Sequence, residues 1–411
     1  MNLFQAADIL LPRSVDLKKW SVIACDQFTS DLDYWQRVRD HAGDAPSVLH
    51  MILPEAELDS HDDTSIARIN GTMDRYLEED VFQCYPKSYV YVERTLENGS
   101  VRPGLVGMVD LEGYNFNEGS VSPIRATERT VLERIPPRKK VRKDAALEFP
   151  HVLMLCDDDQ FSLIEPIRDA KETLPKIYDF DLMEGGGHIS GWLVFGEAAA
   201  AFDERFAAYS ATYRQKYTDL AGESVLLAVG DGNHSLATAK SCYEDLKNRN
   251  PHGDYSNHPS RYALVELENI HDGAQAFEPI HRILVDVDRE KLLRDLNSIC
   301  TPEGHKITCV FGNIRKDLFL DAKRGELAVA VLQEFLDSWL LENTGKIDYI
   351  HGEDEVARLA EQDNSFGFLL PPMEKHSLFR GVIAGGVLPR KTFSMGHARE
   401  KRYYLEGRKI K

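Results

Sequence analysis

The chain has 411 residues and carries 49 basic against 67 acidic side chains, which gives a formal charge of −18. This acidic balance argues against a protein whose whole surface binds nucleic acid, because that affinity depends on neutralising phosphates. Hydrophobic residues make up 43% of the chain, and no run reaches the roughly eighteen apolar residues that a membrane-spanning helix needs.

The first third of the chain reads as a mixture of helices and strands. Residues 1–20 contain neither a basic leader nor a small-residue cleavage site, so we expect a cytoplasmic protein. A buried strand is predicted at 21–28, helices at 31–40 and 65–79, and strands at 88–95 and 105–111, which flank an Asn-Gly turn.

Basic side chains are concentrated in residues 121–143, although the chain as a whole is acidic. Glu128 lies inside this cluster, and a carboxylate surrounded by guanidinium groups stays ionised, which suits a general base beside bound phosphates. The alternative is a solvated helix face with ion pairs at helical spacing, such as Arg125 with Glu128. The basic residues are Arg125, Arg129, Arg134, Arg138, Lys139, Lys140, Arg142 and Lys143.

Three adjacent aspartates, Asp157, Asp158 and Asp159, separate two apolar runs at residues 151–156 and 161–167. The two runs read as the strands of a hairpin. Adjacent aspartates suggest a metal site, but alternate side chains in a strand or turn cannot all face one ion. The pattern therefore favours an Asp-rich turn over a metal site.

Residues 225–240 form the most informative stretch, an apolar strand-like run that breaks at Gly230 and Gly232 before a helix of small residues. A strand that ends in glycines brings backbone N–H groups close to a ligand, and the N-terminus of the following helix attracts anions. Neither the phosphate-loop order GxxxxGK[ST] nor the dinucleotide order GxGxxG is present. The stretch thus predicts an anion site of another kind, with an ordinary tight turn as the alternative.

Side chains at the start of this helix add chemistry to the backbone amides. Asn233 or Ser235 can cap the helix, while Asp231 and His234 can bind a metal, move a proton or donate to phosphate. Under the alternative, Asp231 caps the turn and His234 is an ordinary surface residue.

A polar loop follows at residues 251–257 and is the best candidate for a domain boundary, dividing the chain into residues 1–250 and 251–411. Strands are predicted at 261–270, 278–287 and 347–350, and a helix at 327–342. Near the end of the chain, Lys391, Thr392 and His397 follow a glycine-rich bend. Such a cluster can hold a phosphate or carboxylate, or merely decorate a C-terminal strand.

Three stretches together resemble one known family. TER at 127–129, VGDGNHSLATA at 229–239 and GGVLPRKTFSMGH at 385–397 are similar to the DUF1015 family. That family in turn resembles the ParB/sulfiredoxin superfamily and, within it, an archaeal kinase that phosphorylates free serine. The resemblance implies an α+β fold, with an elaborated ParB/sulfiredoxin-like catalytic core in residues 1–250. A C-terminal α/β domain, residues 251–411, is expected to close the active-site cleft.

The resemblance to the serine kinase also assigns roles to residues. Glu128 matches its catalytic glutamate, and residues 231–235 match its phosphate-binding DGHHR segment. Pro389, Lys391, Thr392 and His397 resemble its C-terminal segment. Two departures stand out: the Pro-His that precedes the kinase glutamate is absent, and Ser235 stands where the kinase has an arginine. A cation from elsewhere must therefore supply the missing positive charge.

The function implied by this resemblance is a nucleotide-dependent kinase that uses ATP or ADP with Mg²⁺ and acts on free serine. Glu128, Asp231 and His234 would be catalytic, with Asp231 also a metal ligand. Gly230, Gly232, Asn233, Ser235, Arg125 and Arg129 would bind the nucleotide, and Lys391, Thr392 and His397 the substrate. With water as acceptor, the same site would be a phosphoserine phosphatase.

Two other functions stay open. The first is a non-catalytic, ParB-like regulator that binds a nucleotide as a conformational switch and acts through a partner. The second is a hydrolase with Cys25 as nucleophile, next to Asp26, although spacing identifies no histidine partner.

Overall fold

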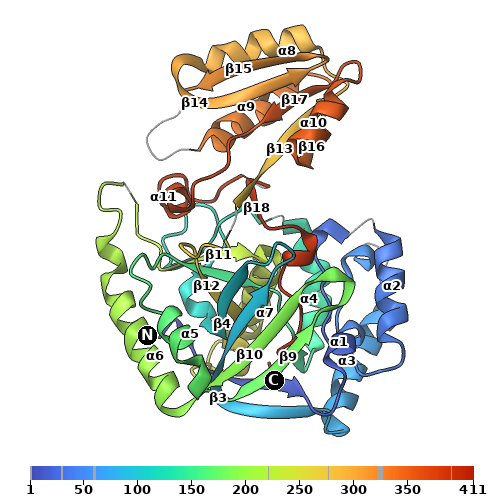
Figure 1. Cartoon of the computed structure of the whole chain (residues 1–411), viewed down its shortest axis with the longest axis vertical. Coiled ribbons are helices and arrows are strands. Elements are labelled where there is room, and N and C mark those ends of the chain that lie inside the picture. Colours follow the sequence, from blue (N-terminus) through green and yellow to red (C-terminus); the bar gives the residue numbers. More distant parts are fainter. Residues whose placement is uncertain are drawn as a thin grey trace.

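Figure 1 shows the computed structural model of the chain, which describes residues 2–28, 31–58, 62–130, 132–220, 222–275, 277–321, 327–389 and 391–411. An 11-stranded sheet and a 6-stranded sheet, each with helices, lie toward opposite ends of the long axis. Both chain termini lie on the part that holds the larger sheet. The predicted α+β class is confirmed. No helix among the described residues has the length and apolar character needed to cross a membrane.

The larger sheet mixes parallel and antiparallel pairs. Its order is β5 (Tyr114–Asn115), β6 (Ile124–Ala126), β11 (Leu227–Asp231), β8 (Leu153–Cys156), β12 (Tyr262–Asn269), β4 (Val101–Asp110), β3 (Phe82–Thr95), β10 (His188–Val194) and β9 (Lys176–Asp181). Two further strands, β1 (Phe4–Gln5) and β2 (Ala7–Pro12), pair with β4 and β3. The pairs β5–β6, β6–β11 and β8–β12 are parallel, and this parallel region carries the candidate site.

Strand β3 shows how the larger sheet forms two hydrophobic cores. Val90 and Val92 belong to one core cluster, and Tyr89 and Tyr91 belong to the other. Successive side chains of a strand point to opposite faces, so both faces of the sheet are buried. The helices of this part are α1 (Leu17–Trp20), α2 (Leu32–Ala42), α3 (Asp63–Glu78), α4 (Ile135–Asp144), α5 (Glu165–Ala170), α6 (Gly196–Thr212) and α7 (Asn233–Arg249).

The smaller sheet has the order β15 (Ile314–Leu320), β14 (Cys300–Phe311), β17 (Phe366–Leu369), β13 (Phe277–Val285) and β16 (Lys346–His351). The first residues of β13 pair instead with β18 (Phe393–Met395), in the stretch between the two sheets. Helices α8 (Arg289–Leu296), α9 (Ala328–Glu342) and α10 (Glu353–Ala360) pack on this sheet. Helix α11 (Lys375–Gly385) packs instead on the larger sheet, where its Leu378 and Phe379 share a hydrophobic core with Leu155.

After β18 the chain returns to the larger part. The indole nitrogen of Trp20 donates to the Leu405 carbonyl at 3.0 Å, and the Tyr404 amide donates to the Val22 carbonyl at 2.8 Å. Strand β19 (Arg408–Lys409) pairs with β7 (Leu147–Glu148). The C-terminal tail thus packs in the same hydrophobic core as the N-terminal residues Trp20 and Val22.

Two predicted elements are wrong. Residues 21–28 form one isolated bridge, from Val22 to Tyr404, followed by a 3-10 helix at Asp26–Phe28. The predicted hairpin partner at 161–167 ends in helix α5 instead, with Pro166 in its first turn. Proline is favoured in the first turn of a helix, because a backbone N–H at that position would have no acceptor within the helix. The division at residue 250 stays a prediction, and the sheets place β12 with the larger one and β13 with the smaller one.

Candidate active site

Segments far apart in the sequence meet in one pocket of about 220 Å³. The end of β6 contributes Glu128, the end of β11 and the start of α7 contribute residues 231–235, and Lys391 comes from the segment before β18. Tyr349, on β16 of the smaller sheet, also lines it. The other lining residues are Cys25, Arg129, Arg134, Arg138 and His151.

The glycine loop of the pocket is shaped by close packing. Gly232 has a φ of +82° and forms the N-cap of α7, without a side-chain cap on the helix. A Cβ on Gly232 would lie 3.0 Å from the Cα of Val152, and one on Gly230 would lie 2.5 Å from the Sδ of Met395. Only glycine combines this left-handed backbone with such close neighbours.

Helix α7 begins at the pocket, and no side chain in the described part of the chain caps its N-terminus. The first i to i−4 hydrogen bond runs from the Leu236 amide to the Gly232 carbonyl, at 3.1 Å. The amides of residues 233–235 precede it and have no intrahelical acceptor. The sequence suggested that Asn233 or Ser235 caps the helix, but neither does. These amides and the positive end of the helix dipole therefore suit an anion.

Glu128 is fixed beside this loop by strand pairing. Strand β6 runs parallel to β11, and the hydroxyl of Thr127 donates to the Val229 carbonyl at 2.6 Å. On its other side, the Leu388 amide donates to the Thr127 carbonyl at 2.7 Å. The Glu128 carboxylate accepts a hydrogen bond from the Thr392 amide, at 3.2 Å and 264 residues away in the chain. Sheet pairing and the C-terminal segment together therefore set the position of this carboxylate.

The segment before β18 is anchored by a buried arginine. Lys391 has a φ of +57°, and its carbonyl accepts a hydrogen bond of 2.8 Å from the guanidinium of Arg282. That guanidinium also lies over the ring of Tyr349, 5.1 Å from its centre. The Thr392 hydroxyl donates to the Pro389 carbonyl at 2.6 Å, so its backbone amide, and not its hydroxyl, is the group that meets Glu128.

Asp231 lies beside a cation that the sequence did not indicate. The ammonium of Lys401 is 3.2 Å from a carboxylate oxygen of Asp231, and the Lys401 side chain is only 8% exposed. The other oxygen of Asp231 accepts a hydrogen bond of 2.9 Å from the Gly232 amide. Lys401, on the returning C-terminal tail, thus brings a positive charge to the glycine loop.

The side chain of Asn233 is incompletely satisfied. Its amide nitrogen lies 3.5 Å from the Thr127 hydroxyl, whereas its oxygen is buried and has no hydrogen-bond partner among the described residues. Buried polar atoms in folded proteins almost always have a partner. A ligand group in the pocket could supply it.

Other predicted residues lie elsewhere. The guanidinium of Arg125 is buried and donates to the carbonyls of Ser122 and Glu223 at 2.9 and 2.7 Å, so it holds backbone and does not line the pocket. Arg129 lines the pocket, but its guanidinium pairs with the Glu118 carboxylate at 3.0 Å. His397 is exposed, 3.4 Å from the Glu278 carboxylate, and lies outside the pocket lining. Arg134 and Arg138 do line it.

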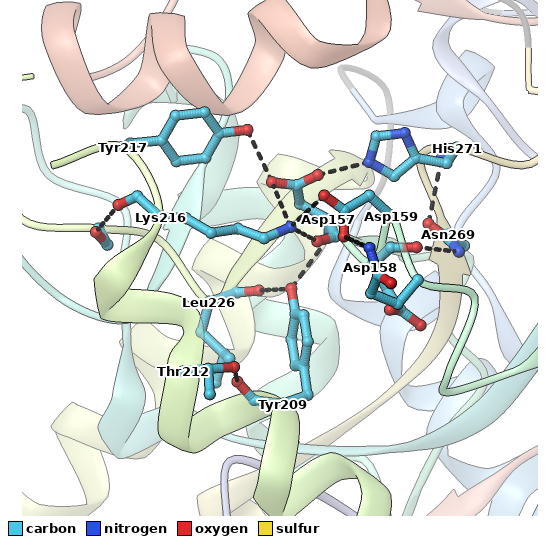
Figure 2. Close-up of polar contacts among 12 residues, drawn as sticks. Asp157, Asp158, Asp159, Tyr209, Thr212, Lys216, Tyr217, Leu226, Asn269 and His271 are labelled. Atoms are coloured by element: carbon cyan, nitrogen blue, oxygen red, sulfur yellow. Dashed lines mark hydrogen bonds and ion pairs between the residues drawn. The ribbon is translucent and has the colours of Figure 1, made fainter. Parts of the chain in front are cut away.

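The Asp157 carboxylate forms a separate buried network, drawn in Figure 2. It lies 2.6 Å from the Nε2 atom of His271 and accepts a hydrogen bond of 2.7 Å from Tyr217, with the Lys216 ammonium at 3.3 Å. Burial alone would raise the pKa of Asp157, but these partners outweigh burial and hold it below its ordinary value. Within the described part of the chain, no group of three acidic, His or Cys side chains suits a metal ion.

The chain matches one protein family and is distantly similar to several solved structures. The family model described as "Protein of unknown function (DUF1015)" matches residues 10–380. No curated protein matches the sequence.

Among solved structures, the C-terminally truncated SbnI of Staphylococcus aureus is 10% identical, with a TM-score of 0.36 over 73% of this chain and 82% of that one. A free serine kinase in complex with AMP is 10% identical, with a TM-score of 0.38 over 74% and 91%. A conserved hypothetical protein from Pyrococcus furiosus is 10% identical, with a TM-score of 0.35 over 72% and 90%.

Proposed function

The chain belongs to the DUF1015 family, and we propose that this member is a small-molecule kinase. It transfers a phosphoryl group from ATP or ADP to the hydroxyl group of a small metabolite. Free serine is the leading acceptor, on the strength of the motif resemblance of Glu128 and residues 231–235 to the serine kinase.

One observation carries the proposal: a carboxylate, an open helix N-terminus and a lysine line the same pocket. Phosphoryl transfer needs a group that accepts the acceptor's proton and positive groups that hold the phosphates. Glu128 fits the first need, and the amides at the start of α7 with Lys391 fit the second. A tight turn without a ligand would have no need of these groups together.

The proposed step begins with the acceptor hydroxyl beside Glu128. Its oxygen bonds to the phosphorus atom, the bond from that phosphorus to the bridging oxygen of the nucleotide breaks, and the hydroxyl proton passes to Glu128. The hydrogen bond that the Thr392 amide donates to Glu128 keeps this carboxylate oriented.

The phosphates of the nucleotide bind the positively charged groups of the pocket. The amides of residues 233–235, the Asn233 side chain and Lys391 hold them, and Arg134 and Arg138 add positive charge at the wall. Mg²⁺ would neutralise phosphate charge, and the donor set present fits it, because this ion commonly takes one or two carboxylates and completes its shell with phosphates and water. Asp231 is the carboxylate nearest the glycine loop that would hold it.

The test is product formation. Purified protein is incubated with Mg²⁺, serine and ATP or ADP, and phosphoserine is measured by mass spectrometry. We expect Glu128→Gln to lower turnover by about 10² to 10⁴-fold, as for other general bases. Asp231→Asn should also lose most turnover. Glu133→Gln, which changes an exposed carboxylate in the same basic segment, is the matched control and should keep wild-type rates.

Other outcomes identify the alternatives. Phosphate release from phosphoserine without nucleotide would make the protein a phosphatase. Nucleotide binding without consumption, across a panel of small alcohols, would make it the nucleotide-binding regulator. Wild-type turnover in Glu128→Gln would refute the assignment of the base.

A further inference from the structure

A second, largely apolar cavity adjoins the active-site pocket. It measures about 150 Å³, a volume at which an apolar cavity can hold a small aromatic ring. Arg138, His151 and Ser235 line both cavities, so the two share a wall at the first turn of α7. The shared wall makes the apolar cavity a candidate extension of the active site.

The walls come from several elements of the larger part. Helix α3 contributes Met73, helix α4 contributes Val141, and the turn after α4 contributes Ala145. Ile52, Phe149, Leu236 and Leu264 are among the other apolar lining residues. Such a lining favours an apolar or aromatic group over a charged one, because it returns little for the lost hydration of a charge.

The one carboxylate in this lining is already neutralised. Glu148 lies 2.6 Å from the Arg142 guanidinium and 2.7 Å from that of Arg408, and it accepts a hydrogen bond from the Leu264 amide. Burial alone would raise the pKa of Glu148, but the charges of Arg142 and Arg408 hold it below its ordinary value. The charge of Glu148 is therefore balanced by these two arginines and does not repel a ligand that carries phosphates.

The two ends of the combined space differ in chemistry. Glu128 and Lys391 line the active-site pocket and not the apolar cavity, whereas Ser235 lines both. The acceptor hydroxyl must reach Glu128, so a small acceptor does not fill the apolar cavity. A molecule that occupies both spaces has its anionic part at the amides of residues 233–235 and its uncharged part among the apolar side chains of the second cavity.

We propose that this apolar cavity binds the heterocyclic base of the nucleotide. The phosphate chain then passes Arg138 and Ser235 to reach the amides at the start of α7. This inference rests on the proposed function, and it assigns Val141 and Ile52 to base recognition. An aromatic base with a phosphate tail matches an apolar cavity that shares a cation, Arg138, with the active-site pocket.

The test separates the base from the phosphates. Val141 is half-buried on the cavity wall, and Val141→Trp fills the cavity without removing a buried group. Calorimetry compares binding of ADP with binding of inorganic pyrophosphate, which needs only the anion site. We expect Val141→Trp to lower the affinity for ADP by about tenfold or more and the affinity for pyrophosphate by less than about twofold. Ile52→Trp, from another wall, should repeat the pattern.

Leu341→Trp is the matched control, since Leu341 is 88% exposed on α9 and is not among the lining residues of either cavity. It should leave both affinities unchanged, and thermal unfolding should show that all variants are folded. Equal weakening of ADP and pyrophosphate, or no weakening of either, would overturn the assignment of the cavity. Wild-type protein that forms phosphoserine equally well from ADP and from pyrophosphate would overturn it too, while leaving the kinase proposal intact.

Discussion

The ammonium of Lys401 lies 3.2 Å from the carboxylate of Asp231, although 170 residues separate them (401 − 231). This pair joins the C-terminal tail to the first residue of the segment 231–235, four residues before Ser235. Lys401 is nearly buried, and its charge faces the loop that precedes α7. We interpret it as a positioning residue for Asp231 that also adds positive potential to the phosphate region.

Replacing Lys401 with methionine should keep the length of the side chain and remove its charge. We expect kcat to fall by about tenfold, with a smaller change in the KM for serine, because an electrostatic contact near the transferring phosphate is lost. Steady-state kinetics give the split. Lys401→Arg should recover part of the rate. Lys140→Met, which removes an exposed charge from α4, is the control, and an equal loss there would point to net charge alone.

Part of this site could be predicted from the sequence because it is local. A strand, two glycines and a helix follow one another within residues 225–240, and the structure shows the same order in β11, Gly232 and α7. Lys401 could not be found this way, since its position depends on the return of the tail to the larger sheet. The resemblance implied that Arg125 binds the nucleotide, but its guanidinium donates to two backbone carbonyls.

The wrong hairpin has a different cause. Residues 161–167 begin with an apolar run that suits a strand, but Pro166 marks the first turn of α5. That signal was present in the sequence and outweighed the apolar pattern. The hydrogen bond from Thr392 to Glu128 depends on an isolated bridge between Glu128 and Leu388 and spans 264 residues, which no local pattern encodes.

The buried network of Asp157 predicts a large loss of stability on substitution. Asp157→Asn removes the charge that His271 and Lys216 face, and the loss of a hydrogen bond to a buried charged group costs about 1.5 to 3 kcal/mol. Urea denaturation measures the free energy of unfolding. Asp159→Asn is the control, because the Asp159 side chain is 54% exposed and 3.6 Å from the same lysine. Similar losses in the two variants would contradict the network's role.

The lowered pKa of Asp157 predicts its share of acid denaturation. A carboxyl group whose pKa is lower in the folded state stabilises the fold above the unfolded pKa of about 3.9 and loses that effect as the pH falls through the folded pKa. The free energy of unfolding of the wild type should therefore fall more steeply below about pH 3.9 than that of Asp157→Asn. Urea denaturation at a series of pH values tests this, and parallel slopes would refute it.

The glycine loop predicts a selective effect of a single methyl group. Gly232→Ala places a Cβ 3.0 Å from the Cα of Val152 and keeps a φ of +82°, so the start of α7 must shift. Gly99 offers a matched control, because its φ is +81° and its Cβ would meet nothing within 4 Å. Both substitutions should destabilise the protein by about 1 to 2 kcal/mol through the left-handed backbone.

Only Gly232→Ala should also weaken pyrophosphate binding, because the amides of residues 233–235 move with the helix. Calorimetry with pyrophosphate and urea denaturation of the same samples separate the two effects. If Gly99→Ala weakened pyrophosphate binding as much as Gly232→Ala, lost stability would explain both. If Gly232→Ala bound pyrophosphate like the wild type, the start of α7 would not be the phosphate site.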